Sequence, residues 1–223
     1  MSVSPVELII VGAGGHGSEL ASYLKDFPRS AQVRLAGFVD EGKPKGSFAG
    51  GKILGNLQDL KVFLRRNGRR RFRYITAVGH NRTRQKLADA VEALGAGNLS
   101  AWTLRHPSSM VGQQVEIGEG TCLAPGTLVT TRGSIGKHCI LNVQASVSHD
   151  AVIGDYCNIN PGPVICGNVR LGRGCYLGAG ATVIDKISIG EWTIVGAGAV
   201  VVEDLPARVT AVGVPARIIK RPG

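Results

Sequence analysis

Residues 147–177 read VSHDAVIGDYCNINPGPVICGNVRLGRGCYL, and they belong to a longer run with a strict period. Every sixth residue from Val111 to Val201 is Val, Ile or Leu. Glycine often follows this aliphatic residue, and mostly small residues stand two places before it. This pattern is typical of a hexapeptide β-helix repeat.

The period predicts the shape of the repeat. A short strand that ends in a tight turn points one bulky aliphatic side chain inward at each step, so three hexads form one triangular coil. Stacked coils pair their strands in parallel about 4.8 Å apart, so residues 111–206 predict about five coils in a prism about 25 Å tall. No insertion breaks the period, so we expect any recognition loop to come from the N-terminal region or from another copy of the chain.

Length and composition indicate two globular domains. The chain has 223 residues, of which 43% are hydrophobic, enough for a core in each half. We place the boundary so that residues 1–105 form the first domain and residues 106–223 the second. No stretch approaches the roughly 20 apolar residues of a membrane span, and the start of the chain lacks a basic signal region. We therefore expect a cytoplasmic protein without membrane association.

The five cysteines fit a reducing compartment, because none forms a C-x-x-C pair. Cys139, Cys157 and Cys175 recur at the spacing of one coil, in the position of small residues. We expect them to form a column of reduced, buried side chains, and we favour this packing role over a metal site or a disulfide.

The net charge of +10 calls for an anionic partner, and RRNGRRRFR (residues 65–73) concentrates much of it. A nucleic-acid groove would need aromatic residues for stacking, and only Phe72 and Tyr74 are near, so we expect no nucleic-acid partner. The favoured interpretation is a solvated basic helix end. Phosphate-bearing small molecules come next, followed by an anionic membrane surface.

The N-terminal region predicts a mononucleotide-binding βαβ unit. Residues 6–11 form a buried strand, GAGGHG (residues 12–17) opens an amphipathic helix, and a second strand over 33–39 ends at Asp40. Such glycines let the backbone approach a phosphate at the helix N-terminus, and Asp40 can accept from a ribose or a base. A third strand is expected over 74–78 and a helix over 82–94.

The same glycines match the dinucleotide fingerprint, which alone is a weak signal. Only about 100 residues precede the repeat, too few for both halves of a dinucleotide fold. No domain for hydride chemistry follows, so an NAD oxidoreductase is disfavoured. A purely structural turn remains the alternative to a nucleotide site.

His149 is the strongest candidate for a chemical role. It lies two places after Val147, at a corner of the repeat, with Asp150 directly behind it. A carboxylate there can fix the tautomer of a projecting histidine, as a general base requires. His138 is a weaker version of the same case. We expect no metal, because a site like that of the trimeric carbonic anhydrases needs several closely spaced histidines. Nucleophilic catalysis is disfavoured, because the cysteines lie in packing positions.

Five segments together resemble one family along nearly the whole chain. They are GAGGHG, FVDE (residues 38–41), VGHN (78–81), the repeat carrying SHD (148–150) and the closing VGVPARIIKR (212–221). The chain resembles the bacterial acetyltransferases of the sialic-acid O-acetyltransferase type, which include N-acetyltransferases of nucleotide-linked amino sugars. The combination is specific, although no single segment is.

The resemblance implies a left-handed parallel β-helix after a Rossmann-like nucleotide-sugar-binding domain, assembled as a homotrimer with active sites at subunit interfaces. It implies acetyl-CoA as donor, His149 as catalytic base and Asp150 as the residue that orients it. The residues in positions that hold the nucleotide are Gly14, Gly15, His16, Asp40, Glu41 and Gly79. Asn142 is a further candidate contact to the sugar.

The acetyl-CoA side carries over less closely. Asn158 stands where some relatives have a histidine, and it can donate a hydrogen bond near the thioester but cannot act as a base. By the same resemblance the pantetheine groove is lined by Gly178, Ala179, Gly196 and Ala197. Arg217 and Lys220 are expected to meet the phosphates of CoA.

The implied reaction is N-acetylation of a nucleotide-linked 4-amino-4,6-dideoxy sugar for a surface polysaccharide or protein glycan. O-acetylation of sialic acid or a related sugar is the alternative among enzymes, since a hydroxyl acceptor needs the same base. A non-catalytic β-helix scaffold or nucleotide-sugar sensor is the alternative outside enzymes. The nucleotide (UDP, GDP or dTDP), the sugar stereochemistry and the pathway stay open.

Overall fold

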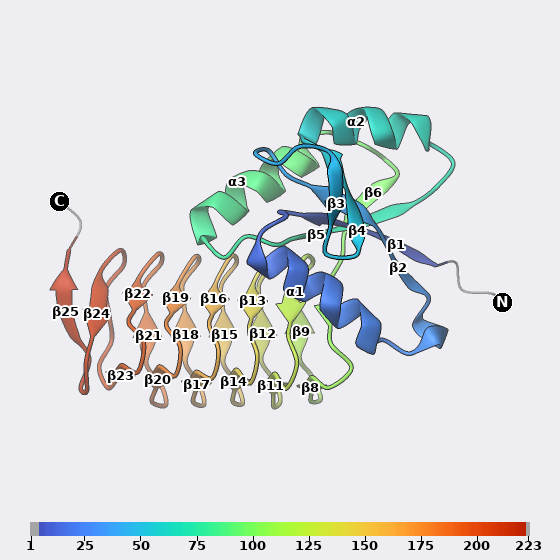
Figure 1. Cartoon of the computed structure of the whole chain (residues 1–223). Helices are drawn as coiled ribbons and strands as arrows, with labels where there is room; N and C mark the ends of the chain where they lie inside the picture. The colour runs from blue at the N-terminus through green and yellow to red at the C-terminus, as the bar shows by residue number, and fades with distance from the viewer. Residues whose placement is uncertain (1–4, 222–223) are drawn as a thin grey trace. The chain divides into compact units, whose positions relative to one another are not determined.

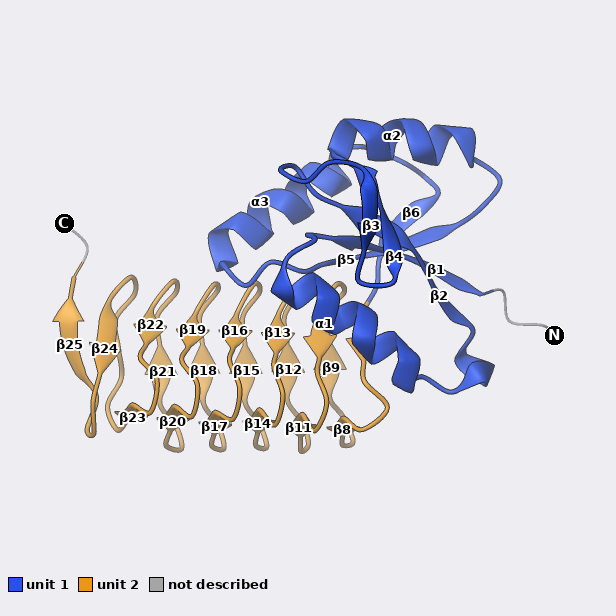
Figure 2. Ribbon diagram, in the orientation of Figure 1, with its two compact units in different colours: residues 1–102 blue, residues 103–223 orange. Residues whose placement is uncertain are grey.

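The computed structural model describes residues 5–221, which divide into two compact units between Trp102 and Thr103 (Figure 2). The first strand of unit 2, β7 (Leu104–Arg105), precedes the aliphatic period. It pairs in register with the following coil, Arg105 lying opposite Leu123. The boundary therefore falls before residue 105. The aliphatic period does not reveal this first strand, because Arg105 occupies the position in which later coils carry an aliphatic residue.

Unit 1 is built on one six-stranded sheet with the order β3-β4-β2-β1-β5-β6 (Figure 1). The strands are β1 (Val6–Val11), β2 (Val33–Val39), β3 (Gly46–Phe48), β4 (Gly51–Gly55), β5 (Phe72–Thr76) and β6 (Leu99–Ala101). β1 pairs in parallel with β2 and β5, and β3 and β4 form an antiparallel hairpin. The first two predicted strands are confirmed. The third begins two residues earlier than predicted, because Phe72 already pairs with Glu7 of β1.

Three α-helices accompany the sheet: α1 (Gly15–Tyr23), α2 (Leu57–Arg66) and α3 (Asn81–Glu92). Two short 3-10 turns, η1 (Leu24–Asp26) and η2 (Arg29–Ala31), follow α1. The sequence did not predict α2, although Asn56 and Asp59 form a capping box at its start. α2 and the sheet share one core, in which Ile9, Leu60 and Tyr74 are at most 2% exposed.

Unit 2 is a prism of three stacked sheets of short strands, typical of a left-handed parallel β-helix (Figure 1). The first sheet contains β7 and then β10 (Cys122–Leu123), β13 (Ile140–Leu141), β16 (Asn158–Ile159), β19 (Tyr176–Leu177), β22 (Ile194–Val195), β24 (Thr210–Val212) and β25 (Arg217–Lys220). The second contains β8 (Met110–Val111), β11 (Leu128–Val129), β14 (Ser146–Val147), β17 (Val164–Ile165), β20 (Thr182–Val183) and β23 (Val200–Val201). The third contains β9 (Glu116–Ile117), β12 (Ser134–Ile135), β15 (Val152–Ile153), β18 (Arg170–Leu171) and β21 (Ser188–Ile189).

Each strand from β8 to β20 pairs in parallel with the strand one coil further on, and the second residue of each strand is the inward aliphatic one. In the second sheet, for example, Val129 lies opposite Val147, and Val147 opposite Ile165. β25 departs from this pattern, because it turns back and pairs antiparallel with β24. The predicted hexad period and the stacking are confirmed.

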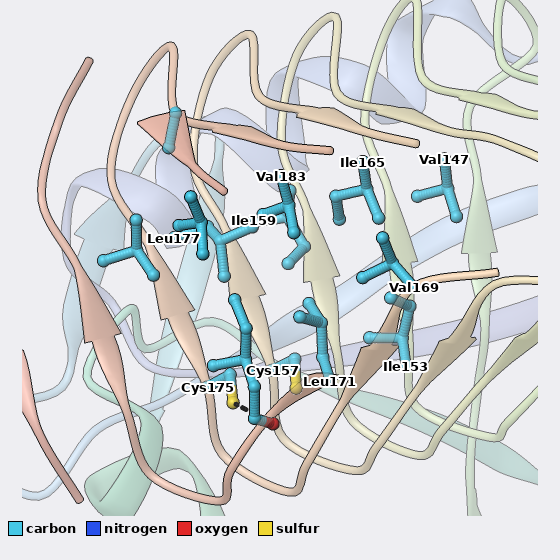
Figure 3. Close-up of a cluster of buried hydrophobic side chains, with 14 of the residues drawn as sticks. Val147, Ile153, Cys157, Ile159, Ile165, Val169, Leu171, Cys175, Leu177 and Val183 are labelled. Atoms are coloured by element: carbon cyan, nitrogen blue, oxygen red, sulfur yellow. Dashed lines mark hydrogen bonds between the residues drawn. The ribbon is translucent and has the colours of Figure 1, made fainter. Parts of the chain in front are cut away.

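The core of the prism is one continuous stack of aliphatic side chains (Figure 3). The cysteine column is confirmed, because Cys139, Cys157 and Cys175 are each 0% exposed. Their thiols donate to carbonyl groups in the following coil, for instance Cys157 Sγ to Gly172 O at 3.2 Å. Burial raises the pKa of the Cys157 thiol. All five cysteines are free thiols.

Within residues 5–221 no helix is both long and apolar enough to cross a lipid bilayer.

Candidate active site

His149 and Asp150 occupy one corner of the prism, between β14 and β15. Asp150 has a φ of 60°, which turns the chain and brings its carboxylate beside the preceding side chain. His149 Nδ1 lies 2.8 Å from Asp150 Oδ2, and the imidazole is 52% exposed. An ionised carboxylate there accepts the Nδ1 proton, which leaves the lone pair of Nε2 directed at solvent.

Arg132 holds the carboxylate from the corner one coil earlier. Its Nε and Nη2 donate to the two oxygens of Asp150, each at 2.9 Å. Hydrogen bonds from Arg132, and then from His149, lower the pKa of Asp150 to about 2. Sequence reasoning missed Arg132, although the period of 18 residues between paired strands puts positions 132 and 150 in the same corner.

Gly167 lies against the imidazole from the next coil. A Cβ on Gly167 would come within 2.6 Å of His149 Cε1 and 2.7 Å of Nε2. The equivalent corner positions in other coils carry Thr131 and Asp185, so the turn itself accepts a side chain. Within residues 5–221 the Gly167 N–H donates to no acceptor. The imidazole therefore lies against a glycine whose N–H has no acceptor within the described residues.

The two hydrogen bonds from Arg132 predict how Asp150 titrates. Because the folded pKa of about 2 lies below the ordinary 3.8, the ion pair stabilises the corner above pH 3.8 and is lost as the pH falls through about 2. In Arg132→Gln we expect the Asp150 pKa to rise toward, but not to, 3.8, because His149 still donates. A 13C NMR titration of the Asp150 carboxyl from about pH 5 to about pH 3 measures this. An unchanged carboxyl titration in Arg132→Gln would contradict the assigned cause.

In unit 1 the glycine turn (residues 12–17) joins β1 to α1. Gly12 has a φ of 115°, and a Cβ there would lie 2.9 Å from Ala77 O. A Cβ on Gly17 would collide with Gly12 O, whereas Gly14 and Gly15 have nothing within 4 Å of theirs. Gly12 and Gly17 are therefore needed for close packing, and the two candidate ligand positions face open space.

These differences predict that two glycine substitutions change the stability of unit 1 to different extents. Gly17→Ala forces the turn to open, and we expect about 1–3 kcal/mol lower stability of unit 1. Gly14→Ala should leave the stability nearly unchanged, because its Cβ meets no atom within 4 Å. Urea unfolding of both variants provides the measurement. Equal destabilisation would show that the close contact at Gly17 is not decisive.

Asp40 and Glu41, expected at the nucleotide, both make hydrogen bonds within unit 1. Asp40 accepts from Ala13 N at 2.8 Å, and from Gly42 N and Lys43 N at 2.9 and 3.1 Å. Glu41 Oε1 accepts from Leu57 N at 2.9 Å, at the start of α2. Asp40 thus fastens the glycine turn to the end of β2, a role that sequence reasoning did not anticipate.

His16 and Gly79 lie at neighbouring strand-end loops. His16 Nδ1 is 3.0 Å from Glu19 Oε2, and within residues 5–221 its buried Nε2 has no hydrogen-bond partner. Burial lowers the pKa of His16, so the ring is neutral near neutral pH. The carbonyls of Val78 and Gly79 accept from Arg84 Nη1 at 2.8 and 3.1 Å. Arg84 is only 1% exposed, and sequence reasoning missed it.

The remaining candidates all belong to unit 2. Asn142 follows β13 and Asn158 starts β16, and these two strands are neighbours. Asn142 Oδ1 accepts from Val143 N at 2.7 Å, and Asn158 is 4% exposed. The proposed groove residues stack in successive coils: they are Gly178, Ala179, Gly196 and Ala197. Arg217 and Lys220 lie in β25, where Arg217 Nη1 is 3.8 Å from Glu203 Oε1.

Comparison with known proteins identifies both units. Residues 7–91 match the model of the PglD N-terminal domain, and residues 150–185 and 168–202 match the bacterial transferase hexapeptide model. The crystal structure of a mutant GDP-perosamine N-acetyltransferase from Caulobacter crescentus, in complex with CoA and GDP-perosamine, is 35% identical. The alignment covers 99% of this chain and 100% of that one, with a TM-score of 0.87. The chain belongs to the PglD-type hexapeptide acetyltransferases.

Other acetyltransferases resemble the chain as well. The acetyltransferase domain of PglB from Neisseria gonorrhoeae FA1090 is 28% identical over 96% of this chain and 99% of that one, with a TM-score of 0.80. UDP-N-acetylbacillosamine N-acetyltransferase from Bacillus subtilis (strain 168) is 40% identical over 114 residues. That match spans 51% of this chain and 49% of the relative, about half of each. The family expected from the sequence is thereby confirmed.

Between residues 5 and 221 no three His, Cys, Asp or Glu side chains gather in a way that could hold a metal ion.

Proposed function

We propose that the protein is an acetyl-CoA-dependent N-acetyltransferase that acts on the 4-amino group of a nucleotide-linked 4-amino-4,6-dideoxy sugar. The observation that carries this proposal is the His149–Asp150 pair, whose Nδ1–Oδ2 distance of 2.8 Å leaves Nε2 free to accept a proton. The full-length similarity to a GDP-perosamine N-acetyltransferase crystallised with CoA and GDP-perosamine supports the donor and the acceptor class.

The proposed reaction takes place at the corner of the prism that carries His149. The sugar amine attacks the carbonyl carbon of the acetyl thioester while His149 Nε2 takes the proton of the amine. Asp150, held by Arg132, stabilises the imidazolium that forms. The Gly167 N–H is the proposed donor to the tetrahedral oxyanion. The C–S bond then breaks, CoA leaves as its thiol with the proton from His149, and no acyl-enzyme forms.

Both substrates are polyanions, which suits a net charge of +10. In the proposal, unit 1 holds the nucleotide through the open glycines Gly14 and Gly15 and through Nε2 of His16, which has no hydrogen-bond partner within residues 5–221. In unit 2 the proposed CoA contacts are Asn158, Gly178, Ala179, Gly196, Ala197, Arg217 and Lys220. A cytoplasmic location is part of the proposal and agrees with five free thiols.

The prism also supports a homotrimer that packs through its second sheet. The outward positions of this sheet include Met110, Leu128 and Val164, which are 68%, 38% and 42% exposed. The outward positions of the third sheet are polar or charged in four of five strands, namely Glu116, Ser134, Arg170 and Ser188. An apolar stripe of this kind is typical of an interface. His149 lies two residues after the end of β14, a strand of this sheet, so the interface would border the base.

This assembly makes a prediction for one outward residue. In Val164→Asp a charge enters the apolar stripe, and we expect sedimentation to find monomers with activity reduced at least tenfold. The matched control is Ser188→Asp on the third sheet, which should remain trimeric. A Val164→Asp variant that stays trimeric would exclude the second sheet as the interface.

The experiment that tests the function is a thiol-release assay with acetyl-CoA. Its acceptors are UDP-, GDP- and dTDP-linked 4-amino-4,6-dideoxy sugars and sialic acid, with NMR of the product to distinguish an amide from an ester. Turnover of one amino sugar to an amide supports the proposal and identifies the nucleotide. Ester formation on sialic acid would favour the O-acetyltransferase alternative, and absence of acetyl-CoA binding would favour a scaffold or sensor.

A further inference from the structure

A second basic region of unit 1 lies outside the site described above. A hollow of about 530 Å³ is lined by Lys61, Arg65, Arg69 and Arg71 and by the turn over residues 94–98. We call it the basic hollow. Its volume lies within the range of roughly 300–1,000 Å³ that is usual for small-molecule sites.

The basic hollow lies at the amino ends of the parallel strands of unit 1, whereas the glycine turn lies at their carboxyl ends. Arg71 and Asn98 immediately precede β5 and β6, which run parallel to β1, whereas the glycine turn follows the carboxyl end of β1. The two regions share no residue. A ligand of the basic hollow is therefore additional to the nucleotide of the proposed function.

The four cations are not used inside the protein. Within residues 5–221 none of the four side chains has an acidic partner or donates a hydrogen bond; they are Lys61, Arg65, Arg69 and Arg71. Arg70, in the same run, differs because it pairs with Glu7 at 2.6 Å. The four cations that line the hollow thus lie together without an anion, and they repel one another unless one is present.

Capping of the α2 C-terminus does not explain them. Asn98 Nδ2 donates to Leu64 O at 3.1 Å and to Arg70 O at 3.2 Å. Phe63 O accepts from the backbone and the side chain of Asn67. Phe63 O and Leu64 O are thus already paired, and within residues 5–221 none of the four cations donates to the carbonyls of Arg65 and Arg66.

We propose that the basic hollow binds a phosphate-bearing ligand with at least two negative charges. Three guanidinium groups suit phosphate oxygens, because each presents a planar fork of donors. Leu64, Leu94 and Ala96 also line the hollow, so part of the ligand can be apolar. A soluble phosphate ester or pyrophosphate and the headgroup of an anionic lipid share this chemistry.

Calorimetry with inorganic pyrophosphate tests the proposal on the full chain. CoA and the nucleotide identified by the acetyl-transfer assay are present at saturation, so that the sites of the proposed function are filled. We expect Arg69→Gln combined with Arg71→Gln to weaken pyrophosphate binding at least tenfold. The control, Arg29→Gln combined with Arg66→Gln, removes the same charge outside the hollow and should bind like the wild type. Equal affinity in both pairs would overturn the proposal.

A second arm distinguishes the two sources of phosphate. It measures cosedimentation with phosphatidylcholine vesicles that contain or lack phosphatidylglycerol. Binding to the anionic vesicles that disappears with Arg69→Gln and Arg71→Gln assigns the hollow to a lipid headgroup, and pyrophosphate binding alone assigns it to a soluble ligand. Failure of both probes overturns the proposal. Acetyl transfer is measured in parallel and should be unchanged, so the two proposals can fail separately.

Discussion

His149→Ala should lower kcat by about 10²–10⁴-fold, because it removes the group that accepts the proton of the attacking amine. No other side chain at this corner can replace it. Arg132 is a permanent cation, and the pKa of Asp150 is lowered to about 2, too low for a base near neutral pH. The acetyl-transfer rate is measured at saturating acetyl-CoA and amino sugar.

The controls separate chemistry from folding. His149 is half exposed, so its truncation should leave the melting temperature and the affinity for CoA nearly unchanged. Asp185→Ala changes the equivalent corner two coils further on and should keep full activity. A fall of less than tenfold in His149→Ala would exclude His149 as the general base.

The prism could be predicted from the sequence because each strand needs an inward aliphatic side chain at a fixed spacing of six residues. One inward aliphatic per strand and the small residues before it leave a signal at every coil from Val111 to Val201. The signal fails only at the ends. The first strand carries Arg105 in place of the inward aliphatic residue, so the pattern does not predict it. β25 turns back as an antiparallel strand, which the hexad period does not predict.

Unit 1 was predicted less completely, for a physical reason. β1 and β2 are apolar runs next to glycine or aspartate, whereas α2 carries a basic, polar face that reads as a loop. Its capping box from Asn56 to Asp59 was the usable signal. The hydrogen bonds of Asp40 and Glu41 to backbone N–H groups depend on loop geometry, which has no counterpart in residue spacing.

In the active site, His149 and Asp150 were predicted because they are adjacent in the sequence, and their hydrogen bond is present in the structure. Arg132 and Gly167 lie one coil before and one coil after this pair, so only the stacking brings them to it. Predicting their roles requires knowledge of the register of the coils as well as of the period. Once the register is known, position 167 is distinctive, since a Cβ there would lie 2.7 Å from Nε2 of the imidazole.

Gly167→Ala should lower kcat about 100-fold while the prism stays folded, because a displacement of about 1 Å in a catalytic group has an effect of this size. The new Cβ would lie 2.7 Å from His149 Nε2, too close for any carbon atom, so the ring must turn away. The three atoms nearest to this Cβ all belong to the imidazole, and the backbone of Gly167 is outside the left-handed region. The stability of the variant should therefore match that of the wild type.

The control for this prediction is Gly133→Ala, on the same prism. A Cβ there lies 3.3 Å from Ala151 O, and the equivalent residue of the next coil is already an alanine, Ala151. We expect Gly133→Ala to keep its activity and Gly167→Ala to lose kcat with little change in the KM for acetyl-CoA. Full activity of Gly167→Ala would mean that the imidazole does not lie against this glycine during turnover, and a fallen melting temperature would assign the loss to folding instead.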